Sequence, residues 1–150
     1  MAVQVGRARK DDAVGEVRVQ VQLTNTIDEG LVRRGLLAAD QVRTATADAM
    51  VDTGATSCCL PAAVVEALGL ATLRQTATQY ADGSLGYVPV TEPVTMNLLG
   101  RLVELPCLVL GDEVLIGQVA LELTDLLVDC QRQRLVPNPA HPDQPVLKVK

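Results

Sequence analysis

The chain has 150 residues, which fits a single domain, and its 48% hydrophobic and 21% charged residues predict a buried core rather than a disordered chain. The net charge of −5 and the shortage of aromatic residues, two Tyr with no Phe or Trp, argue against nucleic acid as a partner, because such binding uses positive charge and stacking rings. The core is therefore expected to be aliphatic.

The first third of the chain predicts two strands. Residues 1–15 lack periodicity and are expected to form a flexible leader. From Val17 to Leu23, apolar residues alternate with polar ones, which is typical of a half-buried strand. Residues 24–40 have no clear pattern and are predicted to be a long loop or hairpin excursion. Alternation resumes over residues 43–51 and ends in the polar turn Asp52-Thr53-Gly54.

The middle of the chain predicts one short helix followed by several strands. Pro61 suits the first helical position and Gly69 suits the residue just after the last one, so a helix is expected between them. Two β-prone runs in residues 72–96 flank Asp82-Gly83, which is a strong hairpin signal. Further strands are expected at residues 94–98, 102–105, 107–110 and 114–116.

The end of the chain predicts a helix, a last hairpin and a tail. Apolar positions over residues 118–127 fit a helix of about two turns. A polar turn at residues 131–133 separates two short β-prone runs, at residues 127–129 and 135–136. Four of the eight prolines lie between Pro137 and Pro145 and exclude regular structure there, whereas the alternation that follows permits an edge strand.

Short strands and frequent turns predict an all-β fold, either a barrel or a sandwich. We expect one domain over residues 16–136, preceded by the leader of residues 1–15. A Pro-rich C-terminal tail of residues 137–150 follows the domain. The chain contains no internal repeat, and Asp-Thr-Gly occurs once.

The sequence gives no sign of a membrane segment or a secreted disulfide scaffold. The N-terminal residues carry charges where a signal peptide needs an apolar run, and no stretch approaches the about 18 apolar residues of a membrane span. The four cysteines, Cys58, Cys59, Cys107 and Cys130, form no Cys-x-x-Cys pair and are too sparse for a disulfide framework. We expect reduced thiols in a cytoplasmic protein without a membrane partner.

The segment around Asp52 carries the strongest chemical signal. Two apolar residues lead from a strand to Asp52, and Gly54 allows tight backbone geometry in the turn. This segment resembles the active-site signature of aspartic peptidases. It is similar in particular to the retropepsin-like branch of the single-lobe bacterial type, because Ala55 follows the glycine and Leu60-Pro61 opens a short helix.

Two other segments resemble the same family, in the same order along the chain. Leu115-Ile116-Gly117 is similar to the apolar-apolar-Gly motif, whose strand passes beside the active-site loop and leads into a helix. Tyr80-Ala81-Asp82-Gly83-Ser84 is similar to the flap tip of pepsin-like enzymes, with Ala81 in place of a glycine. Both aromatic residues, Tyr80 and Tyr87, fall in this hairpin, which would close over a substrate. The resemblance covers residues 17–136 and implies a retropepsin-like closed barrel with one or two short helices.

The resemblance implies an aspartic endopeptidase that acts on a peptide or protein substrate, with no cofactor. The family's chemistry needs two carboxylates about 3 Å apart that share one proton, one serving as base toward water and the other as acid toward the carbonyl oxygen. With a single Asp-Thr-Gly, the second Asp52 must come from another subunit of a homodimer. The resemblance further implies that Thr53 braces the loop and that Gly54 gives access to the backbone.

Other hypotheses fit the same residues. Asp52 can lie at an ordinary strand end, and Tyr80 can be a core aromatic residue. Acidic pairs such as Asp112-Glu113 are expected to lie in solvated turns. A non-catalytic peptide-binding or dimerisation module of the same fold would carry the same motifs. A thiol-redox protein using Cys58 and Cys59 is a third hypothesis. A metal site is disfavoured there, because adjacent strand residues point to opposite faces.

Overall fold

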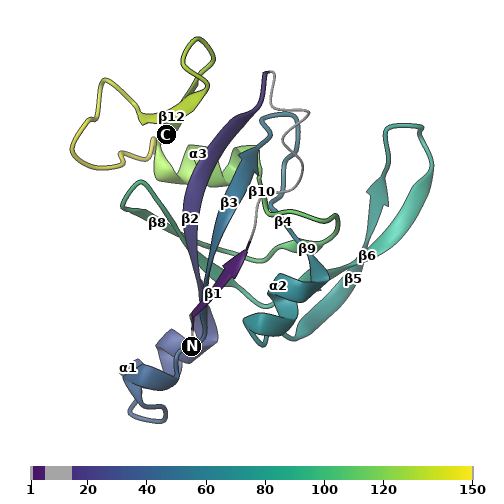
Figure 1. Ribbon diagram of the computed structural model, residues 1–150, viewed down its shortest axis with the longest axis vertical. Helices are drawn as coiled ribbons and strands as arrows, with labels where there is room; N and C mark the ends of the chain where they lie inside the picture. The colour runs from purple at the N-terminus through teal and green to yellow at the C-terminus, as the bar shows by residue number, and fades with distance from the viewer. Residues whose placement is uncertain (1, 6–14, 150) are drawn as a thin grey trace.

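The protein is built around a curled β-sheet, seen in a computed structural model that describes residues 2–5 and 15–149 (Figure 1). The strands are β1 (Ala2–Val5), β2 (Val17–Asn25), β3 (Thr44–Val51), β4 (Cys59–Leu60), β5 (Thr72–Gln79), β6 (Leu85–Thr91), β7 (Val94–Leu98), β8 (Arg101–Leu105), β9 (Leu108–Val109), β10 (Leu115–Ile116), β11 (Leu126–Asp129) and β12 (Arg134–Pro137). The helices are α1 (Thr26–Arg33), α2 (Ala62–Ala67) and α3 (Gln118–Thr124), with a 3-10 turn η1 (Ala39–Gln41).

Strand β3 organises the main sheet, whose order is β5-β6-β9-β4-β10-β3-β2-β7-β8. Strand β2 pairs antiparallel with β3 along its whole length. On the other edge, β1 pairs parallel with the first half of β3, and β10 pairs parallel with its last two residues. Because β5 and β8 end this path, the sheet is a half-barrel and not the closed barrel that was expected. Strands β11 and β12 form a separate two-stranded sheet.

The core is aliphatic, as the composition predicts. Alternate residues of β2, from Val17 to Leu23, are buried, and all of them except Val17 face small alanines of β3 across the strand pair. The largest fully buried side chains are aliphatic: Leu23, Leu60, Leu68, Met96, Leu98 and Ile116. Burial of each such side chain contributes about 1.5–3 kcal/mol.

The prediction of a loop or hairpin over residues 24–40 is wrong, because α1 begins directly after β2. The Asn25 side chain accepts a hydrogen bond from the backbone N–H of Asp28, at 3.0 Å, and so caps the helix. The buried Asp28 carboxylate accepts hydrogen bonds from Nε and Nη2 of Arg43, at 2.9 and 2.8 Å. These bonds hold the pKa of Asp28 below its usual value, and they fix α1 against the start of β3.

Both ends of the chain differ from expectation. Ala2–Val5 forms a strand on β3 where a flexible leader was expected, and the other described residue of that leader, Gly15, lies just before β2; residues 6–14 lie outside the described residues. No strand forms over residues 138–149, so the expected edge strand is wrong there. The domain boundaries remain a prediction. Across the described ranges, no helix has both the length and the apolar character that crossing a membrane requires.

The expected helix after Pro61 is confirmed as α2, and the expected hairpin at Asp82-Gly83 is confirmed by β5 and β6. The expectation of a solvated turn at Asp112-Glu113 is wrong for Glu113. Its carboxylate accepts a hydrogen bond from Nη2 of Arg18, at 2.8 Å, and this pair ties β2 to the loop before β10.

Candidate active site

Asp52 lies at the end of β3, in a loop that we call the Asp52 loop (residues 52–58). Its backbone N–H donates to the carbonyl of Ile116, at 2.9 Å, and its own carbonyl accepts from the N–H of Ala55, at 3.2 Å. The N–H of Gly54 donates to Oδ1 of the Asp52 carboxylate, at 2.9 Å. Asp52 as a residue is half-buried, whereas Thr53 and Gly54 are exposed at the apex of the loop. The loop therefore holds the carboxylate in a defined orientation at the surface.

The segment Leu115-Ile116-Gly117 passes directly beside the Asp52 loop. A side chain at Gly117 would overlap the carbonyl oxygen of Ser57 and lie 2.8 Å from that of Thr56, so only glycine permits this close approach. The first amides of α3 then donate to the same loop: Gln118 N–H to the Ala55 carbonyl, at 2.7 Å, and Val119 N–H to the Thr56 carbonyl, at 3.2 Å. The end of β3, β10 and the start of α3 together fix the loop.

The cysteines near the loop are structural. All four cysteines are free thiols, and Cys58 and Cys59 are buried. Sγ of Cys58 accepts a hydrogen bond from the N–H of Gly117, at 3.4 Å. Burial raises the pKa of both thiols, and the charge of Asp52 adds to this for Cys59. Protonated thiols are poor nucleophiles, which disfavours the redox hypothesis. In the described part of the chain, no three His, Cys, Asp or Glu side chains gather as a metal site.

The hairpin of β5 and β6 extends away from the body of the protein, on the right of Figure 1. Its turn is closed by hydrogen bonds from Tyr80 N–H to the Ser84 carbonyl and from Gly83 N–H to the Tyr80 carbonyl, each 2.9 Å long. Gly83 has φ +86°, which favours glycine. The Asp82 carboxylate accepts from the hydroxyl and the N–H of Ser84, which lowers the pKa of Asp82. Ala81 lies in the same turn.

The two tyrosines of this hairpin lie on opposite faces. A Cβ at Gly86 would lie 2.7 Å from Cε2 of Tyr80, so the Tyr80 ring packs on the Gly86 face of the hairpin. Neighbouring residues of a strand point to opposite sides, which places Tyr87 on the other face, where it is 77% exposed. Gly86 pairs with Thr78, so the face that carries Tyr80, here called the inner face, also carries Thr78, Thr76 and Arg74.

A cavity of about 340 Å³ lies between the inner face and the end of the Asp52 loop. The loop contributes Ser57, and β5 contributes Arg74, Thr76, Ala77 and Thr78. Val90 of β6, which pairs with Arg74, and residues 106–108 complete the lining. Sequence reasoning missed these residues, although the period-two spacing of positions 74, 76 and 78 in the hairpin strand would have placed them on one face.

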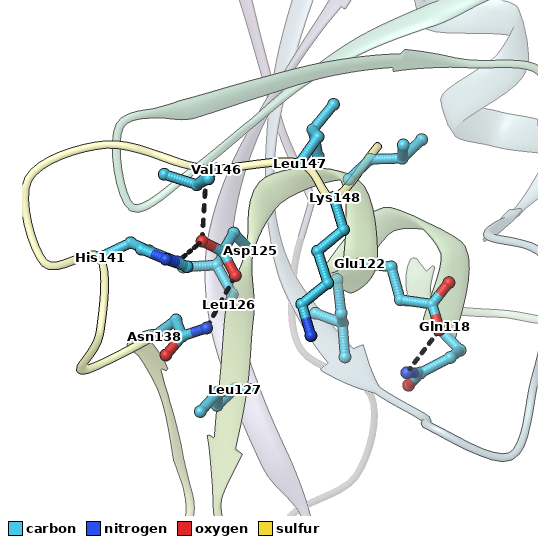
Figure 2. A pocket seen from close by; sticks show the side chains of 12 residues that line it. Gln118, Glu122, Asp125, Leu126, Leu127, Asn138, His141, Val146, Leu147 and Lys148 are labelled. Carbon is cyan, nitrogen blue, oxygen red and sulfur yellow. Dashed lines mark hydrogen bonds and ion pairs between the residues drawn. The ribbon is translucent and has the colours of Figure 1, made fainter. Parts of the chain in front are cut away.

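A larger cavity, of about 610 Å³, lies between α3 and the C-terminal tail (Figure 2). Its lining residues, between Gln118 and Lys148, come later in the chain than Asp52 and the hairpin. The tail is held there by Asp125, whose carboxylate accepts from Nδ2 of Asn138, at 3.0 Å, and from the N–H of Val146, at 3.0 Å. Nδ1 of His141 lies 2.7 Å from the same carboxylate. These contacts, led by Asn138, lower the pKa of Asp125 to about 2.

Comparison with solved structures shows the fold. The crystal structure of the retroviral protease-like domain of Ddi1 from Leishmania major matches with a TM-score of 0.52 and 16% identity, over 95% of this chain and 96% of that one. The protease of EIAV, solved in complex with the inhibitor HBY-793, matches with a TM-score of 0.44 and 19% identity, over 77% of this chain and 92% of that one. The expected retropepsin-like, mostly β fold is confirmed by the first match.

Comparison with protein families identifies the chain. No curated protein sequence matches it significantly. The family model described as "gag-polyprotein putative aspartyl protease" matches residues 40–122, which is more than half of the chain and spans both the Asp52 loop and Gly117. The chain therefore belongs to this retropepsin-like aspartyl protease family.

Proposed function

We propose that this protein is an aspartic endopeptidase that acts as a homodimer, with Asp52 of each subunit forming the catalytic pair. The observation that carries the proposal is the position of Asp52 in a chain of the aspartyl protease family. Its carboxylate is oriented by the N–H of Gly54 in a loop that β10 and α3 support.

A single subunit supplies one such carboxylate, and the surface of the loop suits a twofold contact. Thr53 and Gly54 are exposed at its apex, so a second copy can approach there and bring its own Asp52 alongside. The hairpin also exposes large apolar side chains: Leu73 at 57%, Leu85 at 70% and Tyr87 at 77%. Single exposed apolar side chains are common on protein surfaces, so the proposed dimer contact rests on the loop and not on these residues.

In the proposed reaction, the two carboxylates share one proton because like charges this close cannot both ionise. The ionised carboxylate removes a proton from a water molecule, whose oxygen attacks the scissile carbonyl carbon. The protonated carboxyl gives its proton to the carbonyl oxygen, which yields a neutral tetrahedral intermediate. Breakage of its C–N bond, with transfer of a proton to the leaving amine, releases the two products and restores the shared proton.

The proposal predicts cleavage of a peptide library at acidic to mildly acidic pH, and inhibition by a statine-type analogue of the tetrahedral intermediate. Asp52→Asn is expected to lower kcat/KM by at least about 10³-fold, since the catalytic groups act as a unit. Asp40→Asn, which removes an exposed carboxylate of η1, is the matched control and should retain full activity. Equal activity of the wild type and Asp52→Asn would overturn the mechanism.

The shared pair can be tested separately with two copies joined by a flexible linker. The linked protein with Asp52→Asn in one copy should be as inactive as the protein with both copies changed, because one carboxylate cannot serve as both acid and base. Half of the activity would instead indicate that each subunit works alone. A wild-type protein that binds peptides and never cleaves them would indicate a non-catalytic peptide-binding module.

A further inference from the structure

The cavity beside the Asp52 loop has the chemistry of a site for an anion. Three of its lining residues carry a hydroxyl group: Ser57 from the loop, and Thr76 and Thr78 from the inner face of the hairpin. Arg74 belongs to the same face of the hairpin, two residues from Thr76, and also lines the cavity. Hydroxyl groups and a guanidinium can all donate hydrogen bonds to a carboxylate.

The charge of this cavity is unbalanced. Among the described residues that line it, Arg74 is the only one that carries a full charge, and none is acidic. The ion pairs of the described residues involve Arg18, Arg43 and His141 and leave Arg74 without an acidic partner. Arg74 is therefore available to pair with an acidic group that a ligand supplies.

The rest of the cavity is apolar and uncharged. Val90 and Leu108 form one wall, and they can pack against the methylene groups of a bound side chain. Cys107 lies on the same wall and is buried, which raises the pKa of its thiol well above the usual value, so this group stays neutral. Arg74 therefore sets the charge of the cavity.

We propose that this cavity binds an acidic side chain, Asp or Glu, of the peptide substrate, with Arg74 pairing its carboxylate. The inference rests on the proposed function, because it places a peptide in the space between the hairpin and the Asp52 loop. It defines the substrates as peptides with an acidic residue at one fixed position near the cleaved bond.

The test is the selection of random decapeptides, displayed on phage, on immobilised Asp52→Asn protein at pH 6. We expect Glu or Asp to exceed Gln and Asn at one position by about fivefold, the size of one partly exposed charge pair. The preference should disappear at pH 3, below the ordinary carboxyl pKa of about 4.3, because the peptide carboxylate is then neutral.

Arg74→Glu should invert the selection in favour of Lys and Arg. Arg34→Glu, at the exposed end of α1, is the matched control and should select the same peptides as the parent. No acidic preference in the parent, or the same preference in Arg74→Glu, would overturn the inference. Because the selection uses a variant without Asp52, its outcome is independent of catalysis. An acidic preference without any cleavage by the wild type would overturn the proposed function alone.

Discussion

The Asp52 loop and the β5–β6 hairpin are the two walls of the candidate active site, and they are held in different ways. The amides of Asp52, Gln118 and Val119 join the loop to its neighbours, and Gly117 packs directly on its backbone. The hairpin is held mainly by its own ladder of hydrogen bonds, and most residues of β5 are exposed. One subunit therefore determines the geometry of the loop by itself, whereas the hairpin leaves its surface for a substrate or a second subunit.

This difference predicts that a small substitution beneath the loop lowers stability and activity more than the removal of a large side chain from the hairpin. Gly117→Ala places a methyl group on the carbonyl of Ser57 and must displace either the loop or α3. We expect a loss of about 1–3 kcal/mol in the free energy of unfolding, measured by urea denaturation. We also expect kcat/KM to fall by about 100-fold, because the carboxylate of Asp52 moves with the loop.

Gly30→Ala is the control for a methyl group added to glycine elsewhere. Gly30 lies inside α1, where the nearest atom to an added Cβ would be Nη2 of Arg33, at 3.5 Å, so no clash results. Alanine in a helix interior should raise the free energy of unfolding by about 0.5–1 kcal/mol. A Gly117→Ala protein as stable and active as the wild type would show that the loop does not depend on this contact.

On the hairpin, the two tyrosines provide a matched pair. Tyr80→Ala removes a ring from the inner face of the hairpin and should lower kcat/KM by about tenfold through the loss of about 1.4 kcal/mol of binding to the transition state. Tyr87→Ala removes a ring from the other face and should change kcat/KM by less than about twofold. Both variants should unfold at nearly the wild-type urea concentration. A larger effect from Tyr87→Ala would place the substrate on the other face.

The elements that could be predicted from the sequence are those with a local signal. The alternation of β2, the Pro61 start of α2 and the Asp82-Gly83 turn each lie within a few residues, and the structure contains all three. The sequence also marked Asp52 and Gly117, 65 positions apart, as parts of one site, and the structure places their segments side by side. This was possible because the family motifs preserve the order of these segments.

The features that could not be predicted depend on contacts between distant residues. Helix α1 is stabilised by Arg43, which pairs with Asp28 from the start of the next strand, although its Asn25 cap was a readable signal. Strand β1 exists only by pairing with β3, about 40 residues later. No local sequence pattern indicates Arg74, because its place in the cavity depends on how the hairpin packs beside Ser57. Local sequence patterns therefore predicted the loop and the hairpin of the site, but not the charged residue Arg74 in its cavity.

The C-terminal tail resembles the Asp52 loop, because specific hydrogen bonds hold it in place. The pKa of Asp125 is lowered in the folded protein to about 2, against about 3.9 in an unfolded chain. A lowered pKa means that the charged carboxylate stabilises the folded state above pH 3.9, and that this contribution is lost as the pH falls toward 2. The tail should therefore stay docked at the mildly acidic pH at which the proposed peptidase works.

Hydrogen exchange of the amides in residues 138–149 measures this docking directly. Asp125→Asn removes the charge that accepts from Asn138 and Val146, and we expect these amides to exchange about fivefold faster at pH 6, as for the loss of one hydrogen bond. Asp129→Asn, at the end of β11, is the control and should leave the tail unchanged. The wild-type tail should show the same protection factors at pH 4 as at pH 6, and undocking already at pH 4 would mean that a group other than Asp125 controls it.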